Sequence, residues 1–114
     1  MSNKEISFEE FLKVDIRVGK ILKVQLNEKA KKPAYILDID FGENIGIKKS
    51  SAQITENYQA EELLNKQICA VVNFPIKRVA GIKSEALVLA IVCKNTGAVL
   101  IEPTKPVMNG ERLA

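Results

Sequence analysis

Cationic and hydrogen-bonding side chains gather in one stretch of this sequence, between Asn73 and Leu87. The stretch reads N-F-P-I-K-R-V-A-G-I-K-S-E-A-L and contains Lys77, Arg78, Lys83 and Ser84. Ammonium and guanidinium groups hold phosphates and carboxylates through charge-assisted hydrogen bonds, without breaking a covalent bond. The stretch therefore indicates reversible binding of another charged molecule. The alternative is a solvated hairpin loop whose lysines only keep the protein in solution.

Residue types that carry out catalysis are scarce in this chain. It contains no histidine, no Gly-x-Ser-x-Gly motif and no glycine-rich phosphate loop. We therefore predict no catalytic residues and no enzyme, because the sequence offers no nucleophile with a base to activate it. Cys69 and Cys93 lack the C-x-x-C spacing of metal sites, so we expect no metal and no cofactor. Both are expected to be free thiols, and a disulfide between them is the alternative that the sequence leaves open.

The overall composition is that of one globular domain covering residues 1–114. Hydrophobic residues make up 46% and charged residues 27% of the chain, and the net charge is +3. No apolar run approaches the roughly 20 residues that a membrane-spanning helix needs, so we expect no membrane insertion. The start, M-S-N-K-E, has no apolar export signal. A cytoplasmic location is the resulting expectation.

Two apolar runs flank the cationic stretch and predict buried strands. They cover Ile68–Val72 and Ala86–Val92, and both are rich in β-branched residues. Strand pairing is expected to stop between Pro75 and Gly81, which would leave the connector as an exposed loop. Both faces of these runs are apolar, so part of each must be covered from outside the barrel by a helix or by an identical partner.

Period-two alternation and turn residues place the remaining elements. They predict strands at Val14–Leu26, Tyr35–Phe41, Ile45–Lys49 and Ala98–Ile101, with a bulge or sharp coil at Gly19–Lys20 that lets the strand serve both sides of a small barrel. The passage Ser50–Thr55 is expected to be irregular or helical, and Glu61–Lys66 to form one helical turn. Five short strands with one helical interruption fit an all-β, OB-fold, Greek-key barrel.

A short helix is expected at Ser7–Lys13, ahead of the first strand. Ser7 can cap it, and Glu10 stands three places later as its capping-box partner. Phe8, Phe11 and Leu12 share one face. So short a helix must dock that face, either on one end of the barrel or on a second subunit.

A second cluster of lysines lies in Asn27–Pro33, which reads N-E-K-A-K-K-P. No aromatic residue or glycine accompanies these charges, so we favour plain solvation over a binding role. Tyr58, in the irregular passage, is the aromatic ring that we expect to be most free for stacking, because most of the others fit the core.

Several separated motifs resemble the tRNA-binding domain family. The cationic stretch is similar to the family signature N-x-x-x-[KR]-[KR]-x-x-G-x-x-S-x-x-[ML]-x-L-A, and Asp15–Ile21 resembles its opening strand. The family includes the C-terminal domain of methionyl-tRNA synthetases, the endothelial-monocyte-activating polypeptides and free-standing tRNA-binding dimers. Within it, Asp40–Thr55 and Val71–Pro75 look most like the CsaA-like members.

This resemblance implies a homodimeric OB-fold with a C-terminal extension that helps to build the two-fold interface. For the CsaA-like branch it implies a secretion chaperone that holds unfolded preproteins or peptides, and the alternative is a tRNA-binding protein that uses the same basic surface. Leu87 stands where many tRNA-binding members carry methionine. The binding residues that we expect, for tRNA or peptide, are Lys48, Lys49, Asn73, Lys77, Arg78, Lys83, Ser84 and Leu87.

Overall fold

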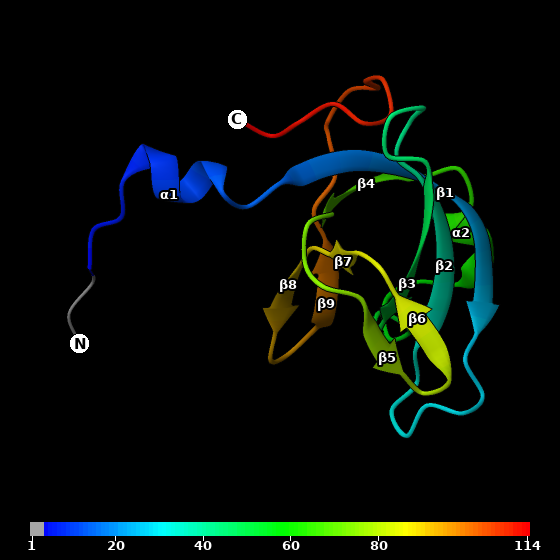
Figure 1. Ribbon diagram of the computed structural model, residues 1–114. Coiled ribbons are helices and arrows are strands. Elements are labelled where there is room, and N and C mark those ends of the chain that lie inside the picture. Colours follow the sequence, from blue (N-terminus) through cyan, green and yellow to red (C-terminus); the bar gives the residue numbers. More distant parts are fainter. Residues whose placement is uncertain (1–3) are drawn as a thin grey trace.

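The computed structural model describes residues 4–114, so Met1–Asn3 of the start sequence lie outside the described part. The elements are α1 Phe8–Leu12, β1 Ile16–Leu26, β2 Tyr35–Asp40, β3 Ile47–Ala52, α2 Ala60–Leu63, β4 Gln67–Val71, β5 Lys77–Val79, β6 Ile82–Ser84, β7 Leu87–Val88, β8 Ala90–Cys93 and β9 Gly97–Leu100. Five strands form an antiparallel sheet in the order β3-β2-β1-β4-β7, which curls into a barrel (Figure 1). The predicted OB-type barrel with short helices is confirmed.

The barrel is filled by the alternate residues that the period-two pattern predicts. Ile21, Leu37, Ile39, Phe41 and Ile68 are each exposed by 1% or less. Burial of such side chains stabilises a fold by about 1.5–3 kcal/mol apiece. This cluster is the interior against which the rest of the chain packs.

β1 serves both walls of the barrel, because its first half pairs with β4 and its second half with β2. The irregularity in its register falls between Ile21 and Lys23, so the bulge predicted at Gly19–Lys20 is wrong by two residues. Gly19 has a different reason to be small: a Cβ there would lie 2.5 Å from Ile39 Cγ2. Only glycine allows the two walls to approach so closely at this point.

The barrel closes between β3 and the segment that follows β6, and side chains make most of that closure. The backbone N–H of Ser51 donates to Ser84 Oγ over 3.1 Å, and the N–H of Lys49 donates to Glu85 Oε1 over 2.9 Å. One backbone bond, from Glu85 N–H to the Lys49 carbonyl over 2.7 Å, completes it. The edge of β3 is therefore satisfied without a regular ladder.

Ser50 belongs to the same closure and lies in the interior. Its side chain is fully buried and Oγ donates to the Ala86 carbonyl over 2.7 Å. The expectation of an irregular or helical passage at Ser50–Thr55 is thus wrong at its start, because β3 continues to Ala52. The strand persists there because its polar residues find partners across the closure.

The cationic connector is a hairpin, and the expected stop in pairing is wrong. β5 and β6 pair with Lys77 opposite Ser84, Arg78 opposite Lys83 and Val79 opposite Ile82. The two residues of the turn, Ala80 and Gly81, have φ of +46° and +89°. Positive φ at both turn positions matches the right-handed twist of paired strands, which is why pairing continues.

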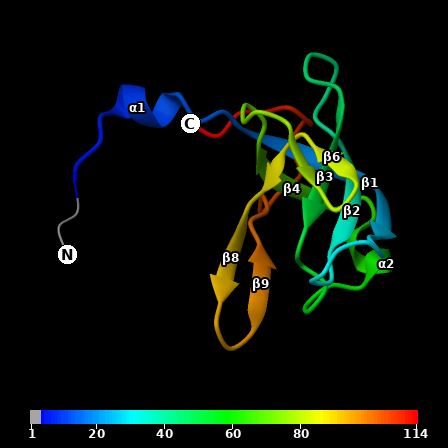
Figure 2. The ribbon, with the colours of Figure 1, turned by 60° about the horizontal axis from the view of Figure 1, so that its bottom comes forward.

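Two segments project from the barrel instead of covering it. The expected strand Ala86–Val92 divides into β7 and β8, and β8 forms a hairpin with β9 that extends outward (Figures 1 and 2). Ile91 is 59% and Val92 85% exposed on this hairpin. An apolar surface of this kind is expected to contact something else.

α1 projects as well, beyond the N-terminal end of β1 (Figure 1). Its capping box is confirmed, because Ser7 Oγ accepts from the Glu10 N–H over 3.1 Å and the Glu10 carboxylate accepts from the Ser7 N–H over 3.1 Å. The helix does not close an end of the barrel: Phe8 is 64% exposed, and only Phe11 packs on a minor cluster around Ile16.

Both cysteines are free, as predicted. Burial raises the pKa of the Cys69 thiol. A hydrogen bond with Thr96 lowers the pKa of the Cys93 thiol, which lies on the projecting hairpin.

The buried Ser50 hydroxyl gives a test of the barrel closure. Ser50→Ala leaves the Ala86 carbonyl with only the longer hydrogen bond from Ser84 Oγ, at 3.5 Å, so we expect the free energy of unfolding to fall by about 1 kcal/mol. Ser51→Ala is the matched control, because Ser51 contributes only its backbone N–H to the closure. Equal stability of the two variants in urea denaturation would contradict this account.

Candidate functional site

An apolar pocket of about 320 Å³ opens beside the β5–β6 hairpin. It is lined by Phe74, Pro75, Lys77, Ser84, Glu85, Ala86 and Leu87. The Phe74 ring is 52% exposed and the Leu87 side chain 48% exposed. Two large apolar side chains therefore lie at the surface, one just before the β5–β6 hairpin and one just after it.

The hairpin itself carries three exposed cations, Lys77, Arg78 and Lys83. None of the three has a carboxylate within ion-pair distance in residues 4–114. Arg78 and Lys83 are direct cross-strand neighbours. Like charges in that position destabilise a strand pair, and a bound anion would relieve the repulsion. Lys77 pairs with Ser84 and lines the pocket instead.

Lys48 and Lys49 lie on β3 and are occupied by neighbouring acids. Lys49 Nζ is 2.7 Å from Asp38 Oδ1, and Lys48 Nζ is 3.9 Å from Glu85 Oε2. The structure therefore brings only part of the expected cation set together. The three hairpin cations are free to contact a ligand, whereas Lys48 pairs with Glu85 at the barrel closure and Lys49 pairs with Asp38 on the neighbouring strand β2.

The polar residues of the signature are engaged within the protein. Ser84 Oγ accepts from the Ser51 N–H, as described above. The Asn73 side chain accepts from the Asp15 N–H over 2.9 Å and donates to the Lys13 carbonyl over 2.7 Å. Asn73 thus fixes the junction between α1 and β1, and Ser84 fixes the barrel.

The aromatic ring exposed beside the hairpin cations is not the one expected from the sequence. Tyr58 packs against the main core, and its hydroxyl accepts from the Leu100 N–H over 3.0 Å. Its backbone carbonyl accepts from the Tyr35 hydroxyl over 2.8 Å. The expectation that Tyr58 is free for stacking is wrong. Phe74 takes that place, and its position directly before Pro75, outside the apolar run, was the available signal.

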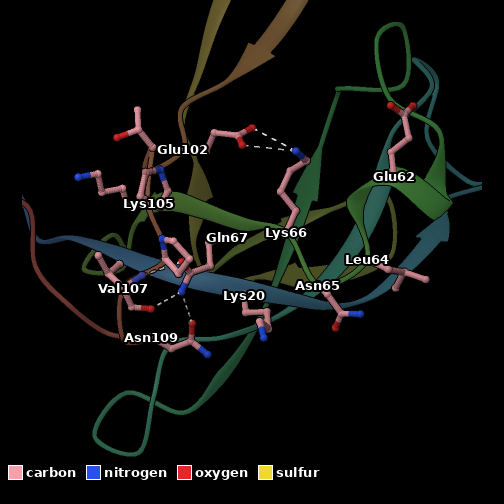
Figure 3. Close-up of a pocket in the computed structure, with 13 residues that line it drawn as sticks. Lys20, Glu62, Leu64, Asn65, Lys66, Gln67, Glu102, Lys105, Val107 and Asn109 are labelled. Carbon is pink, nitrogen blue, oxygen red and sulfur yellow. Dashed lines mark hydrogen bonds and ion pairs between the residues drawn. The ribbon is translucent and has the colours of Figure 1, made fainter.

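Another depression lies elsewhere, between the end of α2 and the segment after β9 (Figure 3). It has a volume of about 640 Å³ and contains Lys20, Lys66 and Lys105. Lys66 pairs with Glu102 over 3.3 Å, and the three ammonium groups point in different directions (Figure 3). The depression therefore lacks the convergent charge of an anion site.

Other kinds of site find no support in the part of the chain that the structure describes. Residues 4–114 contain no cluster of three or more histidine, cysteine, aspartate or glutamate side chains that could hold a metal ion. The same residues contain no helix that is long and apolar enough to cross a membrane.

The barrel, its apolar pocket and its unpaired cations define a binding domain of the OB type. The chain belongs to the tRNA-binding domain family: the family described as "Putative tRNA binding domain" matches residues 16–112. Methionine–tRNA ligases of Porphyromonas gingivalis and Pyrococcus furiosus are 33% and 36% identical to it over 96% and 95% of this chain. The chain spans only 16% and 14% of the length of those ligases.

Solved structures with the same fold match over their whole length. The chaperone CsaA from Bacillus anthracis is 46% identical with a TM-score of 0.91, and it is covered completely by 97% of this chain. The CsaA chaperone from Picrophilus torridus is 48% identical with a TM-score of 0.90, and 96% of this chain covers it completely. The resemblance to CsaA-like members of the family is confirmed.

The two hydrogen bonds of Asn73 predict a local effect on the junction before β1. Asn73→Ala removes the acceptor of the Asp15 N–H, so we expect that amide to exchange with solvent about fivefold faster, which corresponds to about 1 kcal/mol. Hydrogen exchange followed by NMR measures it. Asn44→Ala, a change of the same kind in an exposed turn, is the control and should leave the exchange rate of the Asp15 amide unchanged. An unchanged rate in Asn73→Ala would show that other contacts fix the junction.

Proposed function

We propose that this protein is a non-enzymatic, cytoplasmic chaperone that holds unfolded preproteins or peptides by reversible binding. The observation that carries the proposal is the exposed apolar pocket between Phe74 and Leu87, with Lys77 at its rim. The CsaA chaperones, which match this chain over their full length, support the same conclusion.

The size and chemistry of the pocket suit an extended chain better than a folded partner. A volume of about 320 Å³ is at the small end of ligand pockets, so it holds one or two side chains. Phe74, Pro75 and Leu87 would bury an apolar side chain of the client, and Lys77 would pair with an acidic residue beside it. A single contact of this kind lasts only briefly, and a protein that must release its client needs such short-lived contacts.

The projecting elements favour a homodimer. α1 exposes Phe8, and the β8–β9 hairpin exposes Ile91 and Val92, all without cover from the described part of the same chain. Obligate dimer interfaces resemble a domain core cut in half, with large apolar side chains at their centre. A second copy, with the same unsatisfied surfaces, would bury both.

A second candidate function is tRNA binding, which the family match and the hairpin cations favour. Arg78 and Lys83 stand side by side without an acid, as a phosphate-binding pair would. The exposed Phe74 ring offers a surface on which an unpaired base can stack. The same surface could serve both ligands.

Two titrations separate the candidates. Binding of tRNA should weaken steeply with salt, and charge reversal at Lys77 and Arg78 should abolish it. Binding of an unfolded polypeptide should depend less on salt and show a negative heat-capacity change. That binding should fall on Phe74→Ala and survive the charge reversal, and its absence in calorimetry with a reduced, unfolded test protein would exclude the chaperone role.

Light scattering at micromolar concentration tests the dimer. We expect twice the mass of the chain, and Val92→Lys should shift the protein toward monomer because it places a charge in the interface. Lys94→Ala, a nearby substitution on the same hairpin turn, is the control. A monomeric wild-type protein would exclude the homodimer.

A further inference from the structure

The first half of β1 has an edge that β2 leaves open. β4 pairs with Ile16–Lys20 from one side, whereas β2 begins its pairing only at Lys20. The open edge is taken by the segment Gly110–Leu113, hereafter the strap, which runs alongside β1 in both views of the ribbon (Figures 1 and 2). Without the strap, this edge would offer free N–H and carbonyl groups to any extended chain.

Three backbone hydrogen bonds hold the strap on β1. The Val18 N–H donates to the Glu111 carbonyl over 2.9 Å, and the Val18 carbonyl accepts from the Gly110 N–H over 2.7 Å. The Leu113 N–H donates to the Ile16 carbonyl over 2.9 Å. The strap therefore occupies the edge as a short antiparallel strand.

Charge adds little to this hold. Arg17 on β1 and Arg112 on the strap stand directly opposite each other. The Asp15 carboxylate serves both, because its Oδ1 is 2.6 Å from Arg17 Nε and 3.4 Å from Arg112 Nε. All three side chains are partly exposed, and ion pairs in contact with water stabilise a structure only weakly.

Burial adds little as well. Glu111, Arg112, Leu113 and Ala114 are all exposed. Within the described chain, neither apolar cluster includes a residue after Ile101. Segments with few buried apolar contacts open locally much more often than a core does. The strap should therefore open while the barrel stays folded.

The chain just before the strap is held more firmly. The Gln67 side chain bonds both backbone groups of Val107, donating to the carbonyl over 2.6 Å and accepting from the N–H over 3.1 Å. A Cβ at Gly42 would lie 2.6 Å from the Asn109 carbonyl oxygen, so the two backbones touch there. Gly110 follows with φ of +94°. The strap is thus tethered beside the edge and returns to it readily.

We propose that the β1 edge at Ile16–Val18 is a second contact surface for an unfolded polypeptide, which adds an extended strand there when the strap swings away. Strand addition is recognised through main-chain hydrogen bonds, so it tolerates many client sequences. The strap is the internal competitor that covers the edge between clients. This inference rests on the proposed chaperone function and goes beyond it, because none of these residues lines the apolar pocket at Phe74.

The first experiment follows the Val18 amide by NMR, with a short capped peptide of alternating threonine and valine as the probe. Leu113→Pro removes the donor to the Ile16 carbonyl, so we expect the Val18 amide to exchange with solvent about fivefold faster. The affinity for the peptide, measured from the Val18 amide shift, should rise by the same factor, because the peptide binds only the open form. Ala114→Pro is the control and should change neither value, because the Ala114 N–H makes no backbone hydrogen bond within residues 4–114.

Two further controls locate the binding. The same peptide with proline at alternate positions lacks the N–H groups that a paired strand needs, so it should leave the Val18 amide shift unchanged. Phe74→Ala should not alter the effect of the original peptide on Val18, because Phe74 belongs to the separate pocket.

The second experiment locks the strap. Arg17 and Arg112 form a non-hydrogen-bonded antiparallel pair, whose Cα atoms are typically about 4.5 Å apart and therefore within disulfide range. The Arg17→Cys, Arg112→Cys double variant is made together with Cys93→Ser, since Cys93 is a partly exposed free thiol. The oxidised form should not bind the peptide at the edge, and reduction of the same sample should restore binding.

The outcomes separate this inference from the function on which it rests. If neither the wild type nor Leu113→Pro binds a reduced, unfolded test protein, both are overturned. If the wild type binds that protein, but the peptide leaves Val18 unaffected in Leu113→Pro or binds the locked and reduced forms equally, only the edge surface is overturned. Protection of the Val18 amide that grows with protein concentration in Leu113→Pro, without peptide, would also overturn it, because a second copy would then occupy the edge.

Discussion

The structure depends on one constraint: the curled sheet must close between β3 and the chain that follows β6. The sheet ends at β3 on one side and at β7 on the other, so the amides of β3 would be left without partners. Ser84 and Glu85 supply side-chain oxygens where a ladder would supply carbonyls. Those two residues also line the apolar pocket. The closure of the barrel and the wall of the site are therefore one segment.

The cations near the site fall into two groups, those on β3 that pair with carboxylates and those on the β5–β6 hairpin that do not. On β3, Lys48 pairs with Glu85, which the closure brings next to the sheet, and Lys49 pairs with Asp38 on β2. The hairpin cations have no carboxylate within ion-pair distance among the described residues, although Arg78 and Lys83 repel each other across the strands. Stability alone would favour an acid at one of these positions. The repulsion is tolerable in a hairpin that a bound polyanion can neutralise.

Local patterns in the sequence predicted the parts of the fold that depend on local physics. Alternation placed β1 and β2, and a continuous apolar run placed β4, because four of the five residues of β4 are buried. The capping box at Ser7 and Glu10 is complete within four residues. β3 was cut short because Ser50 and Ser51 are polar and find their partners 36 and 33 residues away. Hydrogen bonds between residues so far apart in the chain produce no periodic pattern in the sequence.

The candidate site was predictable in its location and much less in its roles. Residue types identify Lys77 and Arg78 as cations, but only the fold shows which cations lack an acid. Asn73 looks like a ligand-binding amide in the motif, yet it holds the α1 junction, while its neighbour Phe74 reaches the surface. A polar side chain that holds the backbone in place can matter to binding as much as one that touches the ligand. Within the motif, the uncharged polar residues Asn73 and Ser84 therefore hold the backbone in place, and the charged residues Lys77, Arg78 and Lys83 stay exposed.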